Sequence, residues 1–249
     1  MIKTLLFTLS LLPFAANAAD LANPAESAEP QKVVISAQRD PEWASYRHAY
    51  KAVAFFASFT HSRPLIQAHM QIRALQKDAS LEGLHLQLIG KTTHLDIDVD
   101  NIGRATIPMQ KAAYEEDAVL RLNREKGIYY FSGRYSIKER EDGVYQIADL
   151  RAAYDQLLSA QKDSGYWLRL IGKKCKGIKF VYASSASDAS VDFQDTAKLS
   201  TAIKAVDDHP FEDKSMAMYK VAIYRFSDWP EQGEIITKMR PIAIGTAYD

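Results

Sequence analysis

The sequence contains a single cysteine and no excess of either charge. Cys175 is the one cysteine among 249 residues, and 31 Lys and Arg side chains balance 31 Asp and Glu side chains. One cysteine cannot form an intramolecular disulfide, which excludes a disulfide-bonded scaffold and leaves a packed core as the source of stability. The balanced charge provides no strong field for a nucleic acid, so we expect no nucleic-acid partner.

Motifs that identify common enzymes are also missing. The sequence has no HExxH, CxxC or GxSxG motif, no glycine-rich phosphate loop and no dinucleotide-binding fingerprint. The mostly apolar stretch 5–15 is shorter than the about 20 residues that span a bilayer, and no long apolar stretch follows it. We therefore expect neither a motif-defined enzyme nor a transmembrane segment in the mature chain.

The first residues are typical of a cleavable export signal. Lys3 precedes the apolar stretch, and Ala16 and Ala18 provide the small residues that a signal peptidase requires. We predict a signal peptide over residues 1–18, cleaved after Ala18, and a periplasmic or secreted mature protein. Residues 19–32 are small, acidic and proline-containing, which predicts a disordered leader.

The periodicity of the remaining chain predicts a β-rich fold, all-β to α+β, with antiparallel sheets packed like a sandwich. An N-terminal helix is expected from Asp40 to about Phe59, and a second helix in mid-chain from Leu150 to about Ala160, with Asp149 as its N-cap. Period-two alternation predicts strands elsewhere. They are expected at residues 69–74, 84–88, 95–99, 118–122, 128–131, 166–171, 178–182 and 216–226, with a final pair near 234–244.

Two of these strands predict a hairpin with a two-residue Gly90-Lys91 turn. This turn places Leu86 opposite Leu95 and puts the leucines on one face of the hairpin. His85 then lies opposite Asp96 on the other face. The stretches 118–122 and 128–131 predict a second hairpin.

The domain organisation has two interpretations. Residues 33–160 form a helix and a β-sandwich-like unit, and residues 161–249 form a second β-rich unit, or both belong to one continuous domain. The segments 86–91 and 168–173 share the pattern LxLIGK, which suggests a duplication, although this pattern is also common in a strand followed by a turn.

Two clusters of residues are candidate sites. His85, His94 and Asp96 share the polar face of the first predicted hairpin, where imidazoles and a carboxylate can hold a divalent metal ion, unless this is an ordinary solvated face. No other cofactor is expected. Lys173, Lys174, Cys175 and Lys176 form a basic turn that can attract an anion and lower the pKa of the thiol, unless it is a solvated hairpin tip.

Several short segments resemble a group of uncharacterised exported proteins of Gram-negative bacteria. They are the run from Ser36 to Trp43 with Tyr46-Arg47, the spacing Asp100-x-x-Gly103-x-x-x-x-Pro108, Asp117-Ala118 with Asn123 and Gly127, and Asp149-Leu150-Arg151. The resemblance covers about Val33 to Arg151. It implies export and a β-rich fold, and it carries no activity or catalytic residue to this chain.

The sequence therefore favours a non-enzymatic periplasmic binding or envelope-associated module. Its partner is expected to be an envelope component or a small ligand. The alternative is a hydrolase or metal-dependent enzyme that uses the His/Asp face of the first hairpin.

Overall fold

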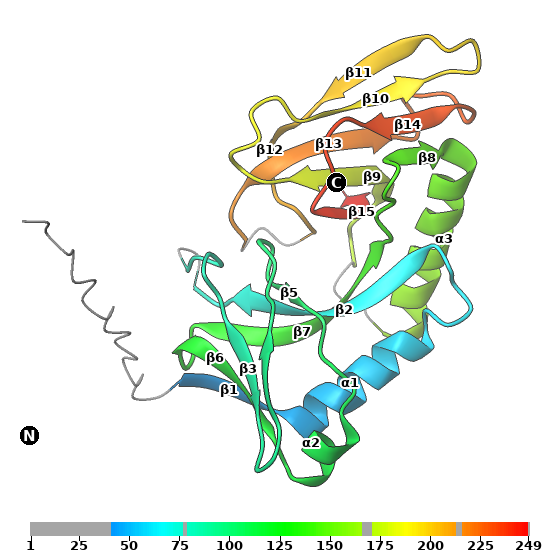
Figure 1. Ribbon diagram of the computed structural model, residues 1–249. Coiled ribbons are helices and arrows are strands. Elements are labelled where there is room, and N and C mark those ends of the chain that lie inside the picture. Colours follow the sequence, from blue (N-terminus) through cyan, green and yellow to red (C-terminus); the bar gives the residue numbers. More distant parts are fainter. Residues whose placement is uncertain (1–40, 77–78, 166–170, 213–215, 249) are drawn as a thin grey trace, which may run out of the picture. The chain divides into compact units, whose positions relative to one another are not determined.

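The protein is described here by a computed structural model that covers residues 41–76, 79–165, 171–212 and 216–248. These residues form three helices and three antiparallel sheets, which confirms the predicted β-rich, sandwich-like fold (Figure 1). The predicted signal peptide, leader and N-cap Asp40 lie outside the described residues, as does most of the strand expected at 166–171.

The N-terminal sheet has four strands in the order β1-β6-β3-β4. The C-terminal sheet also has four, in the order β11-β10-β14-β8, and the central sheet has seven, in the order β12-β13-β9-β15-β7-β2-β5. Their bounds are β1 Pro41–Ser45, β2 Ile66–Ala74, β3 Leu86–Ile89, β4 His94–Ile97, β5 Arg104–Ala105, β6 Val119–Glu125, β7 Tyr129–Ile137, β8 Val144–Gln146, β9 Cys175–Tyr182, β10 Ser190–Gln194, β11 Ser200–Lys204, β12 Val206–Asp208, β13 Tyr219–Arg225, β14 Glu234–Thr237 and β15 Ala243–Tyr248.

The N-terminal helix begins later than predicted. Residues Pro41–Ser45 form strand β1, and helix α1 spans Tyr46–Ser58. β1 pairs with β6, so that Trp43 lies opposite Arg121, and the Glu42 carboxylate accepts a hydrogen bond from the Gly127 amide. These contacts with a distant strand outweigh the local helix-start signal, which was therefore wrong by about five residues.

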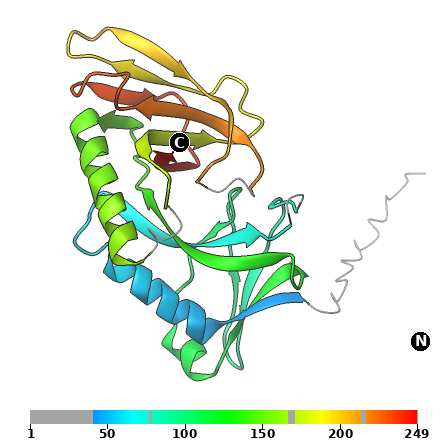
Figure 2. The same cartoon turned by 180° about the vertical axis from the view of Figure 1, so that it is seen from behind.

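The mid-chain helix is longer than predicted. α3 spans Ile147–Asp163, so Asp149 lies in its first turn and not at its N-cap, which is Gln146. A short helix that was not predicted, α2, spans Lys111–Glu115. α1 and α3 lie along the same side of the described chain in both views (Figures 1 and 2).

The first hairpin exists, but its predicted register was wrong by two residues. Leu86 pairs with Ile97 and Leu88 with Leu95, because the connection is a four-residue loop, Gly90 to Thr93. The Glu116 carboxylate, from a distant segment, accepts hydrogen bonds from the Thr92 amide and the Thr93 hydroxyl, each at 2.7 Å. A shift of two keeps every side chain on its predicted face, although Leu95 on the outer strand is exposed and not buried.

The second predicted hairpin is wrong. β6 and β7 follow each other in the chain but belong to different sheets, since β6 pairs with β1 and β3 while β7 pairs with β2 and β15. The same holds for the expected final pair, because β14 lies in the C-terminal sheet and β15 in the central sheet. Alternation identifies such strands, but it does not identify their partners.

Two apolar cores occupy one face of the central sheet. In the first, the C-terminal sheet and α3 pack on β9 and β13 through buried residues that include Leu150, Phe180, Phe193 and Tyr224. In the second, the N-terminal sheet and α1 pack on β2 through residues that include Tyr46, Ile72 and Leu86. The described residues 41–248 belong to one compact unit, and the central sheet takes strands from both sides of the expected boundary near residue 160.

The other face of the central sheet carries polar side chains that are also buried. Gln71 and Arg73 on β2 and Ser132, Arg134 and Ser136 on β7 are each at most 8% exposed. A third, smaller apolar cluster that includes Ile102, Phe211 and Met216 lies on this face. Among the described helices, none is long and apolar enough to cross a membrane.

Candidate functional site

A cleft of about 650 Å³ opens beside strand β4 on the polar face of the sheets. Its walls come from β2, from β4 and the chain after it, from β5 and the segment that follows it, and from the chain after β7. The lining residues are Gln67, Ala68, His69, Leu95, Asp96, Ile97, Asp98, Val99, Asp100, Arg104, Thr106, Pro108 and Glu139. Segments that are up to 72 residues apart in the sequence, Gln67 and Glu139, thus meet here.

Pro108 explains why a gap forms next to β4. The chain after β4 is joined to β5 by the bridge between Val99 and Ala105. Two residues beyond Thr106, Pro108 has no backbone N–H and cannot continue a ladder with β4. The carbonyl of Pro108 instead accepts a hydrogen bond of 2.5 Å from the hydroxyl of Tyr46, which lies at the start of α1. The Tyr46 hydroxyl in turn accepts a hydrogen bond from the Gln110 amide. The segment is held against the helix, and the space beside β4 stays open.

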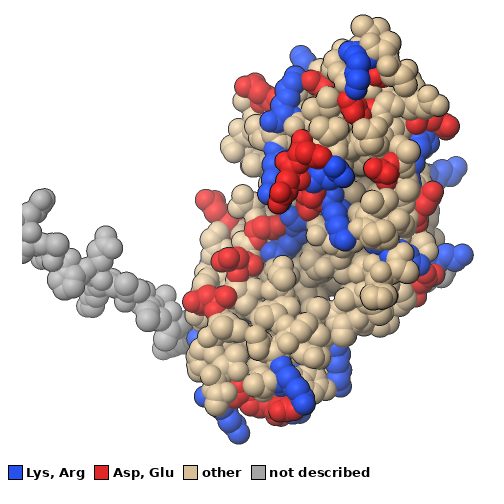
Figure 3. Space-filling model, turned by 45° about the vertical axis from the view of Figure 1, so that its right-hand side comes forward, with Lys and Arg blue, Asp and Glu red and all other residues tan. Residues whose placement is uncertain are grey.

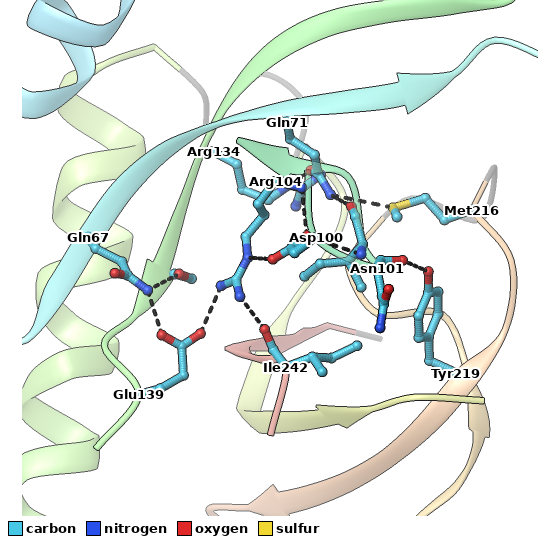
Figure 4. A network of polar contacts seen from close by, with 12 residues as sticks. Gln67, Gln71, Asp100, Asn101, Arg104, Arg134, Glu139, Met216, Tyr219 and Ile242 are labelled. Atoms are coloured by element: carbon cyan, nitrogen blue, oxygen red, sulfur yellow. Dashed lines mark hydrogen bonds and ion pairs between the residues drawn. The ribbon is translucent and has the colours of Figure 1, made fainter. Parts of the chain in front are cut away.

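Arg104 organises the floor of the cleft (Figure 4). Its guanidinium pairs with Asp100 at 2.6 Å and with Glu139 at 2.8 Å, and it donates to the Ile242 carbonyl. The Glu139 carboxylate also accepts a hydrogen bond from the Gln67 amide at 2.7 Å. Burial alone lowers the pKa of Arg104, but the two carboxylates outweigh it and raise that pKa above its usual value, so the guanidinium remains charged.

His69 contributes a partly buried imidazole to the same wall. Its Nε2 is buried and has no hydrogen-bond partner among the described residues. Burial lowers the pKa of His69 well below 6.5, and the positive charges of Arg104 and Arg134 lower it further. The imidazole is therefore neutral at pH 7 and adds no positive charge to the cleft.

The cleft has a negative balance of charge. Four carboxylates, those of Asp96, Asp98, Asp100 and Glu139, and one guanidinium line it, which leaves a formal charge of −3. Hydrogen bonds from Gln87 and His85 lower the pKa of Asp96 and keep it ionised. Asp98 is exposed, and no described residue donates a hydrogen bond to its carboxylate.

The predicted metal site is only partly assembled. His85 Nε2 and Asp96 Oδ1 are 2.9 Å apart, whereas His94 lies opposite Ile89 at the other end of the strand pair. In the described part of the chain, no three His, Cys, Asp or Glu side chains are grouped in a way suited to a metal ion. Asp96 belongs to the cleft wall, and the two histidines do not.

The predicted basic turn differs from the expectation in the properties of its cysteine. Lys173, Lys174 and Lys176 are exposed, and the free Cys175 is partly buried at the start of β9. Burial raises the pKa of the Cys175 thiol and outweighs hydrogen bonds from its neighbours, so the expected lowering by the lysines was wrong. The thiol lines a separate hollow of about 410 Å³ with Tyr154 and Tyr248, which favours a packed, slowly reacting cysteine.

Sequence reasoning missed His69, Arg104 and Glu139, although one signal was present. The spacing of Asp100, Gly103 and Pro108 was noted only as a resemblance. In the structure Asp100 binds Arg104, Gly103 turns the chain at a φ of 80°, and Pro108 separates its segment from β4. A Cβ on Gly103 would lie 2.4 Å from the Ile72 carbonyl oxygen, so this position requires glycine. The three residues together shape the cleft.

Comparisons with protein-family models, curated proteins and solved structures gave no match to the chain. The surface offers no further guide, since acidic and basic side chains are interspersed over the face shown in Figure 3. Function must therefore be argued from the cleft.

Proposed function

We propose that the protein is a non-enzymatic binding module of the cell envelope and that the cleft beside β4 holds its ligand. The observation that carries the proposal is the formal charge of −3 in the cleft lining, where the exposed Asp98 carboxylate has no hydrogen-bond partner among the described residues. A cleft lined by one sign of charge attracts a ligand of the opposite charge. The export signal predicted at residues 1–18 supports the location.

The lining supports binding better than catalysis. It contains no Ser, Cys, Lys or Tyr, and Thr106 carries its only hydroxyl. The charged groups on its floor are engaged with each other, since Arg104 pairs with both Asp100 and Glu139. A hydrolase that acts through a hydroxyl or thiol nucleophile requires a base within hydrogen-bond reach of that nucleophile. The lining shows a set of hydrogen-bonding groups suited to holding a ligand.

The charge of the cleft indicates what kind of ligand it takes. A formal charge of −3 attracts a cation, and the free Asp98 carboxylate can accept hydrogen bonds from an ammonium or guanidinium group. A neutral His69 adds no repulsion. The ligand is therefore a cationic molecule with several N–H donors.

Calorimetric titration of the mature protein with spermidine, maltose and inorganic phosphate tests this proposal. We expect spermidine to bind and the other two not to bind. Asp98→Asn and Asp96→Asn should each weaken spermidine about tenfold, because each removes a carboxylate charge from the cleft, a loss worth about 1.4 kcal/mol. Lys198→Gln, a charge change in the turn between β10 and β11, serves as a control that leaves the affinity unchanged. Binding of phosphate, or spermidine binding that ignores both cleft variants, would overturn the proposal.

A further inference from the structure

Strand β4 is an edge strand whose outer backbone groups can be identified. In the described chain its only sheet neighbour is β3. The Gly90 amide donates to the Thr93 carbonyl, and the Asn123 amide from β6 donates to the His85 carbonyl. In antiparallel pairs the bonding direction alternates along each strand. Both bonds lead to the same assignment of backbone directions. The N–H and C=O groups of Leu95 and Ile97 point toward β3, whereas those of His94 and Asp96 point away from it.

This free edge borders the cleft. Six consecutive residues, 95–100, line it. Successive side chains of a strand point to opposite faces, so an unbroken run of lining residues means that the cleft follows the backbone edge and not one face. On the opposite wall, residues 67–69 of β2 precede the short β5 pairing at Met70 and Gln71. The cleft is thus bordered by backbone from two strands.

β4 is short, with four residues, but it lacks three other features that protect an edge strand. Edges are commonly blocked by Lys, Pro or a bulge. Residues His94–Ile97 contain neither Lys nor Pro, and their pairing with β3 is regular. The exposed edge strand β11, by contrast, ends in Lys204. An edge without these features is suited to accept an added strand.

Charge identifies the added strand. Asp96 and Asp98 are two residues apart and therefore project from the same face of the extended chain, and both line the cleft. A partner in extended conformation also presents alternate side chains on one face, and opposite charges across a strand pair are favourable. Basic side chains at alternate positions of the partner therefore meet the two carboxylates.

We propose that β4 binds an extended basic peptide segment, with Lys or Arg at alternate positions, as an added antiparallel strand. This inference rests on the proposed function and names the ligand class of the same cleft. Backbone bonds to His94 and Asp96 supply affinity, and the carboxylates of Asp96 and Asp98 supply selectivity for a basic chain.

Two charge-matched peptides test the inference. Acetyl-Lys-Val-Lys-Val-Lys-amide, the valine peptide, can pair through its backbone, whereas the same peptide with N-methyl groups on its second and third lysines, the N-methyl peptide, lacks two of the N–H groups that pairing needs, because the lysines opposite Asp96 and Asp98 direct their N–H groups to β4. We expect the valine peptide to bind at least tenfold more tightly to the mature protein. Asp98→Asn should weaken both peptides. Equal affinities that both depend on Asp98 would overturn strand addition and leave the proposed function standing, whereas no binding of either peptide or of spermidine would overturn both.

Amide hydrogen exchange gives a second readout in the unaltered protein. On addition of the valine peptide, the His94 and Asp96 amides should gain protection, while the Leu95 and Ile97 amides, already directed to β3, should not change. The variant His94→Pro removes one outward N–H and should reduce the affinity of the valine peptide toward that of the N-methyl peptide. Protection spread evenly over residues 94–97, or absent from them, would contradict strand addition.

Discussion

Two stretches of this sequence alternate in the same way and yet differ in the structure. β2 places Met70 and Ile72 in the same apolar core to which β3 contributes Leu86 and Leu88. The polar residues next to them differ in exposure. Gln71, between Met70 and Ile72, is fully buried, whereas His85, directly before Leu86, is about half exposed.

The difference comes from segments that are far away in the sequence. The Gln71 amide donates to the Ile102 carbonyl and contacts the Met216 sulfur, and the Arg134 guanidinium lies 3.8 Å from the centre of the Phe211 ring. No described segment covers the polar face of β3 and β4 in this way. Alternation therefore predicts which side chains share a face, but coverage by another segment decides whether that face is buried or exposed to solvent.

Removing one charge from the covered polar face should have the largest effect. Arg134 and Glu212 form an ion pair at 2.8 Å, with side chains 4% and 8% exposed. Glu212→Gln removes the carboxylate that compensates the buried guanidinium, which should lower the free energy of unfolding by about 3 to 5 kcal/mol. Urea denaturation measures this loss. The double variant Arg134→Met, Glu212→Leu should be less destabilised than Glu212→Gln. If Glu212→Gln were as stable as the parent protein, the ion pair would be accessible to solvent and not buried.

The apolar face shared by both stretches provides the next largest effect. Leu86 is fully buried in the core under β3, and Leu86→Ala should cost about 2 to 5 kcal/mol in the free energy of unfolding. Its matched control is Leu95→Ala on the neighbouring strand, which should cost only about 0.5 kcal/mol because Leu95 is 39% exposed. Equal losses in urea denaturation would show that the hairpin faces are assigned incorrectly.

The third prediction concerns pH on the covered face. Burial, Arg104 and Arg134 hold the pKa of His69 well below 6.5, so the folded protein keeps this imidazole neutral. Below pH 6.5 the unfolded chain binds a proton that the folded chain does not, and stability falls as pH falls, by at most about 1.4 kcal/mol per pH unit. Unfolding measured from pH 7.5 to 5 should show this slope. His69→Gln should reduce it, and an unchanged slope would contradict the assignment.

The open polar face should show the smallest effect. His94→Ala removes an exposed side chain and should change the free energy of unfolding by no more than about 0.5 kcal/mol. EDTA should leave the melting temperature of the parent protein unchanged. If His85, His94 and Asp96 hold a metal ion, the variant melts at a lower temperature in metal-replete buffer and the chelator reproduces that loss in the parent protein.

Local pattern predicted nine of the described strands, namely β2, β3, β4, β6, β7, β9, β13, β14 and β15. It did not predict β1, β5, β8, β10, β11 and β12. Three further misses have non-local causes. The register of β3 and β4 depends on Glu116, whose carboxylate holds the connecting loop. The start of α1 depends on the pairing of β1 with β6. The cleft depends on the contact between Tyr46 and Pro108, two residues whose numbers differ by 62. Each contact joins segments that are too far apart in the sequence for a local pattern of residues to predict it.

The place of the last strand determines whether the central sheet is continuous. β15, residues Ala243–Tyr248, lies between β7 and β9 in the interior of the central sheet. On one side of it lie β7, β2 and β5, and on the other side lie β9, β13 and β12. Without β15 these two groups of three strands share no neighbouring strands, and each has a newly exposed edge, so this one segment makes a single sheet out of two.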